Sequence, residues 1–187
     1  MNSGLFKRWN LTLITNPVID GHVATETLPS GQQLFVQSLL PASSTITARN
    51  ATADLTTIAE LEPSQFVMTI QDPSNPMDTR FLHVLQGADA GAAMVPATHL
   101  TSTSGTPFDG AIFGSFAVYF PVSATAQFAS TMFSVPAGVH TLLVTGLAPN
   151  ASYTASVSVA GSGHTITVSP GGTGATADAA GVLMLTF

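Results

Sequence analysis

The sequence predicts an all-β fold, an antiparallel β-sandwich of about a dozen short strands, from three observations. Apolar and polar residues alternate with a period of two through most short runs of the chain. Turn signals built from 16 glycines and 12 prolines separate these runs. No long segment shows the 3.6-residue periodicity of an amphipathic helix.

The first half of the chain contains a regular series of predicted strands. Trp9, Leu11 and Leu13 alternate with polar residues up to the turn Asn16-Pro17. Residues 23–28 and 33–40 form a predicted hairpin with the connection Pro29-Ser30-Gly31, and Pro41 ends its second strand. Further strands are expected at 44–49, 65–71 and 80–86.

One segment, 54–61, has the spacing of a short helix. Leu55, Ile58 and Leu61 recur every three residues after Asp54, a residue type that caps helix N-termini. Nearby threonines disfavour a helix because they are β-branched, so an irregular or extended segment is an equal alternative. We therefore expect at most one short helix, near 54–61.

The second half continues the pattern, with strands expected at 99–102, 110–120, 127–135, 140–147, 153–159, 165–169 and 182–187. The turn signals are Asp109-Gly110, Pro136-Ala137-Gly138, Pro149-Asn150, Gly161-Ser162-Gly163 and Pro170-Gly171-Gly172. The last third is interpreted as a sub-unit of its own. We expect a β-sandwich sheet region at 1–135 and a terminal β sub-unit at 136–187 that completes it or packs on it, or a single domain 1–187.

The stretch before Tyr153, Gly146-Leu147-Ala148-Pro149-Asn150, resembles the tyrosine corner of fibronectin type III and related sandwiches. The resemblance implies that the Tyr153 ring is buried and that its hydroxyl bonds to nearby backbone. The alternative is a strand tyrosine that faces solvent. The side chains expected in the core are Trp9, Leu34, Val36, Phe81, Leu85, Phe116, Val118, Leu143 and Tyr153.

Charge and composition exclude several classes of function. Four Lys and Arg residues against ten Asp and Glu give a net charge of −6, which excludes nucleic acid as a partner and disfavours polyanionic polysaccharides. Without cysteine there are no disulfides, zinc–thiolate sites or cysteine nucleophiles. No apolar run reaches the roughly 18 residues of a membrane span. Low charge with abundant Thr, Ser, Ala and Gly is typical of secreted proteins, so we expect an extracellular protein, secreted or at the cell surface.

No catalytic, cofactor-binding or metal-binding residue is predicted. The five histidines, at 22, 83, 99, 140 and 164, include no pair with the spacing of metal ligands. His83 shares a strand face with Phe81 and Leu85, so a buried imidazole bonded to backbone or a carboxylate is favoured over catalysis. The loop Asp72–Asp78 is either an Asx turn or a calcium site. Asn10, Asn50 and Asn150 begin N-glycosylation motifs of undetermined use.

Four segments resemble the C-terminal β-region of heparinase II/III-like polysaccharide lyases: FKRWNL at 6–11, GQQLFVQSLLPA at 31–42, RFLHVLQ at 80–86 and DAAGVL at 178–183. The resemblance covers most of the chain, but its motifs are strands and turns. Thr12 stands where the family pattern often has a histidine. In this family the catalytic His and Tyr belong mostly to a helical toroid, which this chain lacks.

The resemblance implies a non-catalytic accessory β-sandwich of a secreted protein, giving structural support or contacting a glycan surface. The chain itself is therefore not expected to be an enzyme. Its expected partners are a covalently or non-covalently associated catalytic domain, or identical subunits in a homo-oligomer or filament, with a glycan as a further ligand. The alternatives are a self-assembling extracellular subunit and a carbohydrate-binding module.

Overall fold

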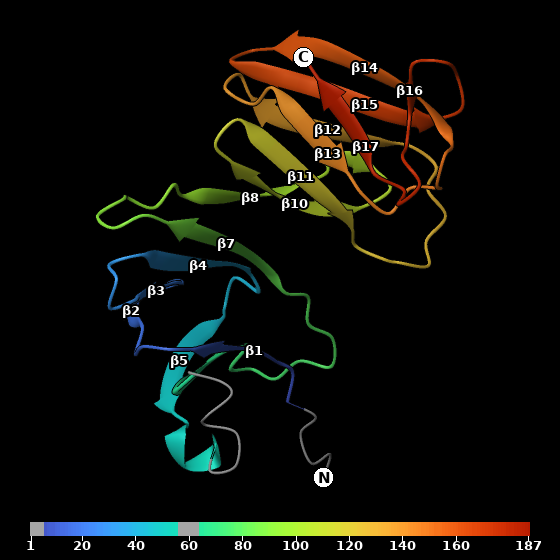
Figure 1. The fold of residues 1–187 in the computed structure, drawn as a ribbon. Coiled ribbons are helices and arrows are strands. Elements are labelled where there is room, and N and C mark those ends of the chain that lie inside the picture. The colour runs from blue at the N-terminus through green and yellow to red at the C-terminus, as the bar shows by residue number, and fades with distance from the viewer. Residues whose placement is uncertain (1–5, 56–63) are drawn as a thin grey trace. The chain divides into compact units, whose positions relative to one another are not determined.

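The computed structural model describes residues 6–55 and 64–187, and within them the prediction of an all-β fold is confirmed. Seventeen strands and a single 3-10 turn make up the regular structure of this part of the chain. The chain divides into two compact units, Met1–Val95 and Pro96–Phe187 (Figure 1). Each unit has its own sheets and its own hydrophobic core.

The N-terminal unit contains two antiparallel sheets. One has the order β1-β6-β5 and the other the order β2-β3-β4-β7. Alternate residues of β1, β3, β4, β5 and β6 form a small core of Leu13, Ala24, Val36, Ile46, Met68 and Ile70. The strands are β1 (Arg8–Leu13), β2 (Val18–Asp20), β3 (Val23–Thr27), β4 (Gln33–Leu40), β5 (Thr45–Asn50), β6 (Phe66–Gln71) and β7 (Leu82–Ala88).

The hairpin predicted around Gly31 is confirmed. Strands β3 and β4 pair antiparallel, and Gly31 has a φ of +89°, a backbone conformation that strongly favours glycine. The segment 54–61, where a short helix was predicted, lies mostly outside the described residues. Its beginning belongs to the 3-10 turn η1 (Thr52–Leu55).

A buried carboxylate holds the start of this unit together. Glu26 on β3 is 7% exposed, and its Oε1 accepts hydrogen bonds from the backbone N–H groups of Ile14 at 2.6 Å and Thr15 at 2.8 Å. These bonds fasten the connection after β1 to the neighbouring sheet, and they satisfy a charge that would be costly to bury alone.

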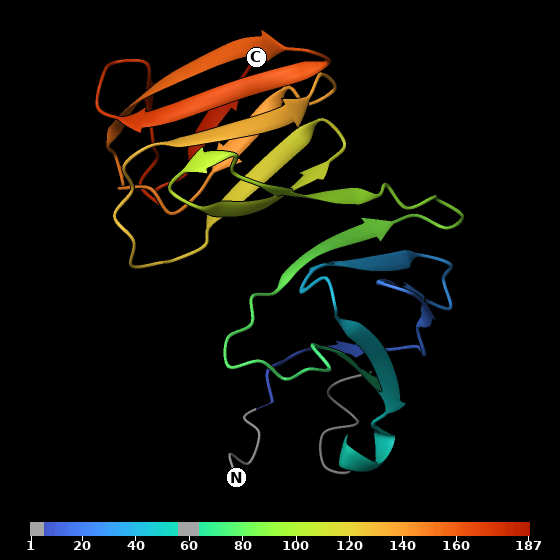
Figure 2. The same cartoon turned by 180° about the vertical axis from the view of Figure 1, so that it is seen from behind.

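The C-terminal unit is a sandwich of two five-stranded sheets with the orders β17-β13-β11-β10-β8 and β16-β14-β15-β12-β9 (Figure 2). Its core includes Phe108, Tyr119, Phe133, Leu142 and Ile166, each at most 2% exposed. The strands are β8 (Ala97–Thr101), β9 (Ser104–Gly105), β10 (Phe108–Phe113), β11 (Phe116–Pro121), β12 (Thr131–Pro136), β13 (Thr141–Val144), β14 (Ser152–Ala160), β15 (Gly163–Pro170), β16 (Ala175–Thr176) and β17 (Leu183–Thr186).

The division between the units differs from the boundary expected after residue 135. Strand β12, just before that boundary, pairs with β15 beyond it, and β11 pairs with β13. The last third of the chain therefore shares both of its sheets with residues 96–135, and the compact units divide after Val95.

The single strand predicted at 110–120 is a hairpin. Strands β10 and β11 pair antiparallel across a turn at Gly114-Ser115, where Gly114 has a φ of +58°. The predicted turn at Asp109-Gly110 lies inside β10 instead. A Cβ atom at Gly110 would come within 2.8 Å of Cδ1 of Tyr119, so this glycine makes room for an aromatic ring.

The predicted core is correct at two positions and wrong at two others. Val36 and Tyr153 are buried, whereas Leu85 is 47% exposed and Phe116 is 53% exposed. The remaining five predicted core residues are half-buried. The strands around the two errors are apolar at odd and even positions alike, so alternation alone could not say which set faces the core.

Candidate functional site

The outer surface of one sheet of the C-terminal unit carries a cluster of apolar side chains from β11, β13 and β17, bordered by the polar Asp109 and Thr141, which lie opposite Phe120 and Phe116. Ala117 and Tyr119 of β11 are fully buried, so their neighbours Phe116, Val118 and Phe120 point away from the core. In the sheet register Val118 lies opposite Leu143 of β13, and Leu143 lies opposite Met184 of β17. We call Phe116, Val118, Phe120, Leu143 and Met184 the apolar face. Phe116, Phe120 and Met184 are 53%, 43% and 66% exposed.

The other sheet of the same unit has a polar outer surface. Thr154, Ser156 and Ser158 of β14 lie opposite Ser169, Thr167 and Thr165 of β15, on the face away from the core. A sandwich sheet in contact with water carries polar residues on its outer face. The hydroxyl-bearing sheet follows this rule and the apolar face does not, which makes the apolar face the candidate functional surface of the unit.

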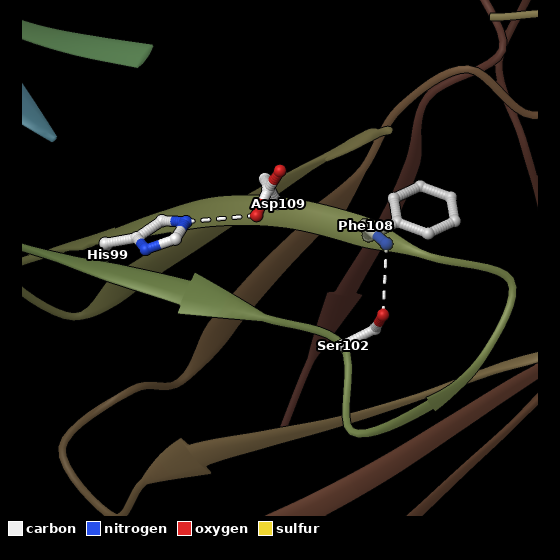
Figure 3. A network of polar contacts seen from close by, with 4 residues as sticks. All are labelled: His99, Ser102, Phe108 and Asp109. Atoms are coloured by element: carbon white, nitrogen blue, oxygen red, sulfur yellow. Dashed lines mark hydrogen bonds and ion pairs between the residues drawn. The ribbon is translucent and has the colours of Figure 1, made fainter. Parts of the chain in front are cut away.

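A His–Asp pair lies on strands β8 and β10 (Figure 3). His99 Nε2 is 3.1 Å from Asp109 Oδ1. Nearby, the Ser102 hydroxyl accepts a hydrogen bond from the N–H of Phe108 at 3.0 Å. In Figure 3 the His99 ring points toward Asp109, and Ser102 lies at a distance on the far side, beside Phe108. The serine thus supports the turn before β10, and these residues do not form a nucleophile–base pair.

His83 lies in an aromatic cluster of the N-terminal unit. Its ring centroid is 4.6 Å from that of Trp9 and 5.7 Å from that of Phe81. Both ring nitrogens are buried, and neither has a hydrogen-bond partner among the described residues, so the predicted bond to backbone or a carboxylate is not found there. Burial lowers the pKa of His83 to about 4. A neutral imidazole that packs as an aromatic ring accounts for this geometry.

The Asp72–Asp78 loop has the hydrogen bonds of an Asx turn. Asp72 Oδ1 accepts from the N–H and the hydroxyl of Ser74, and Oδ2 accepts from the hydroxyl of Ser43. These bonds, with those of Ser74 first, hold the pKa of the Asp72 carboxyl below its usual value. Both carboxylate oxygens are already engaged. Across 6–55 and 64–187, no three His, Asp or Glu side chains converge as metal ligands would.

The tyrosines and the tryptophan do not form an exposed platform for stacking on sugars. Tyr119 is 0% exposed and Tyr153 is 3% exposed, while Trp9 is half-buried against His83. Among the phenylalanines, tyrosines and tryptophan of the described chain, the exposed rings are phenylalanines. The geometry therefore gives the carbohydrate-binding alternative little support.

Tyr153 has the contacts that its sequence pattern implies. Its hydroxyl accepts a hydrogen bond of 2.9 Å from the N–H of Ala148, five residues earlier. The ring lies edge-on to Phe128 at 5.8 Å and borders a surface cavity of about 410 Å³. A relationship to fibronectin type III domains stays a prediction.

The sequence did not identify the residues of the apolar face, and it placed Phe116, Val118 and Leu143 in the core. The signal of this face is present in residues 116–120, Phe-Ala-Val-Tyr-Phe, which are apolar at every position. A strand that is apolar on both faces is a buried strand or a strand with a covered outer face. No protein-family model matches the chain, and no curated protein matches it.

We predict that the two buried tyrosines respond in opposite ways to loss of the hydroxyl. Tyr153→Phe leaves the N–H of Ala148 without its acceptor and should lower the free energy of unfolding by about 1–2 kcal/mol. Tyr119→Phe removes a buried hydroxyl that has no partner among the described residues, and should be neutral or stabilising. Urea denaturation followed by circular dichroism measures both. Equal losses would contradict the assigned bonds.

We also predict a pH-dependent stability of the N-terminal unit. The His83 pKa is about 4 in the folded state against 6.5 for an ordinary histidine, so between these values the unfolded chain binds more protons. The free energy of unfolding should rise from pH 4 to about pH 6.5, and this contribution is complete above that value. Trp9 is the single tryptophan, so its fluorescence monitors this unit.

The variant His83→Leu should show a smaller rise of stability with pH than the wild type. Replacing His140 by Leu controls for the loss of a histidine, and because His140 lies in the C-terminal unit, this change should leave the transition that Trp9 reports in the N-terminal unit unaltered. All three proteins contain the same carboxylates, so the difference between the curves isolates His83. Identical slopes in His83→Leu and the wild type would show that the imidazole is protonated as easily when folded as when unfolded.

Proposed function

We propose that the chain is a non-catalytic accessory β-module of a secreted, heparinase II/III-like protein of the polysaccharide lyase type. In this role it supports a catalytic domain and meets it through the apolar face. The single observation that carries the proposal is the contrast between the two outer surfaces of the C-terminal unit. One carries hydroxyl side chains, and the other exposes Phe116, Phe120 and Met184.

Burial of the apolar face contributes to the driving force for docking. A large apolar side chain contributes about 1.5–3 kcal/mol when it passes from full exposure to full burial. Phe116, Phe120 and Met184 are partly exposed in the free chain, so each gains part of this free energy when a partner covers it. Few charges oppose contact, because only 7% of the residues are charged.

The candidate proton-transfer groups of the chain fit a non-catalytic role. Lyase chemistry requires a base that reaches the substrate. Burial raises the pKa of the Tyr119 phenol far above its usual range, and the ring nitrogens of His83 are buried. Together with the resemblance to the lyase family, this favours a chain that supports a catalytic domain and does not itself catalyse the lyase reaction.

A self-assembling extracellular subunit is the second candidate. The same apolar face and the same low charge favour it, because a face that lacks its catalytic domain can contact another copy of the chain. In both candidates the face is an interface, and the partner differs.

We predict association through the apolar face in the isolated chain. Light scattering should detect oligomers that persist at high salt, because apolar contacts are not screened. Phe116→Ser combined with Met184→Ser should reduce the fraction of species larger than a dimer at least fivefold, while Val18→Ser, at a 73% exposed apolar site of the other unit, serves as the control. Association that dissolves in salt, or that ignores the double variant, would count against the interface.

We predict no lyase activity for the chain. After incubation with alginate or heparan sulfate, the ultraviolet absorbance of unsaturated uronate products should not rise above that of a heat-denatured sample. This absorbance arises from proton abstraction beside the uronate carboxylate, which needs an accessible base. A rise that depends on the concentration of folded protein would refute the accessory role without bearing on the interface.

A further inference from the structure

Strand β14 has an open edge over most of its length. In its sheet it lies between β15, which pairs with residues 153–160, and β16, which pairs with Ser152 and Tyr153 alone. No described strand pairs with residues 154–160 on the β16 side. Val157 is 42% and Val159 is 80% exposed.

The direction of the open backbone groups follows from a neighbouring bond. The carbonyl of Ala151 accepts a hydrogen bond from the N–H of Ala177, on the side of β16. In an antiparallel ladder every second residue directs its N–H and C=O to the same neighbour. Ala155, Val157 and Val159 therefore present their N–H and C=O groups at the open edge, whereas Ser156 and Ser158 bond to β15.

This edge lacks the usual protection of strand edges. Proteins block such edges with lysine, proline, bulges or a covering segment. Residues 154–160, Thr-Ala-Ser-Val-Ser-Val-Ala, contain no charge and no proline, and the pairing with β15 runs without a bulge. An uncharged strand with open backbone groups is a template for pairing with another strand.

The edge is complementary to itself. When two copies pair antiparallel about Val157, this residue faces its own copy and Ala155 faces Val159. All three of these pairs join residues whose backbone groups point outward, and each pair exchanges two bonds, about six in all. Apolar side chains then meet on one face of the joined sheets, while Ser156 meets Ser158 on the other.

The symmetric register also fits the ends of the open edge. Pairing about Val157 uses residues 155–159, which contain all three outward-facing residues. It stops at Thr154, because Gly174, just before β16, lies beside that residue: a Cβ at Gly174 would be 3.9 Å from the Thr154 Cα. The partner strand turns away there toward its own loop Gly161-Ser162. Pairing centred one residue earlier or one residue later would join two outward-facing pairs instead of three, because Tyr153 already pairs with β16 and residue 161 belongs to the turn.

We propose that the open edge of β14 is a homodimer interface, in which a second copy of this chain pairs antiparallel about Val157. The two sheets then join into one continuous sheet. Because both copies use the same surface, the contact is closed and yields a dimer, not a filament. The interface is separate from the apolar face, which lies on the other sheet of the sandwich.

Cysteine cross-linking tests the register directly, because the natural chain has no cysteine. In the proposed pair the two Val157 Cα atoms are about 5.5 Å apart, within the span of roughly 4.4–6.8 Å that a disulfide tolerates. Val157→Cys should form a covalent dimer under mild oxidation. The matched control is Val159→Cys, which is more exposed but whose copies lie roughly 14 Å apart along the strands.

A faster or equal cross-link at Val159→Cys would overturn the register, and no preferential cross-link at Val157→Cys would overturn the interface.

Val157→Pro supplies an equilibrium measurement. It removes an outward N–H while leaving the bonds to β15. Sedimentation should therefore give a dimer dissociation constant at least tenfold higher than that of the wild type. An unchanged dimer in this variant, or a wild type that stays monomeric at every concentration, would refute the proposal. Phe116→Ser should leave the Val157→Cys cross-link unchanged, which separates this interface from the apolar face.

Discussion

The packing of Tyr119 against Phe133 determines which surfaces the C-terminal unit presents. The two ring centroids are 4.0 Å apart, and Gly110 leaves the space that the tyrosine ring occupies. With Tyr119 and Ala117 directed into the core, strand alternation directs Phe116, Val118 and Phe120 outward. A one-residue shift of β11 would exchange these two sets and bury the phenylalanines in place of the tyrosine. The apolar face is therefore a consequence of the core and not a separate feature of the surface.

Much of the fold could be predicted from the sequence, because short alternating runs and turn residues are local signals. The hairpin at Gly31 and the bonded hydroxyl of Tyr153 follow from such signals. The sequence does not reveal the turn at Gly114, because apolar residues surround it. Asp109-Gly110 has the composition of a turn, but Gly110 lies within a strand, where a Cβ atom would be 2.8 Å from the ring of Tyr119. The division after Val95 depends on pairing between distant strands, which no local pattern contains. The candidate surfaces were missed for the same reason, since an outer face and an open edge exist only once the sheets are formed.

The two surfaces of the C-terminal unit suit an accessory role in complementary ways. The apolar face offers area for contact with a catalytic domain, and the open edge of β14 offers backbone hydrogen bonds with a fixed register. One protein can use both at once, because they lie on different sheets. Two of the histidines contribute to packing or to a local pair: His83 beside Trp9 and His99 beside Asp109.

Hydrogen exchange of the wild-type chain measures the open edge most directly, because it reports single amides without any substitution. The amides of Ser156 and Ser158 bond within the chain and should be protected at every protein concentration. The account predicts that the amides of Ala155, Val157 and Val159 exchange rapidly in dilute protein and become protected together as the concentration rises. Rapid exchange of these three amides at all concentrations, beside protected Ser156 and Ser158, would contradict it.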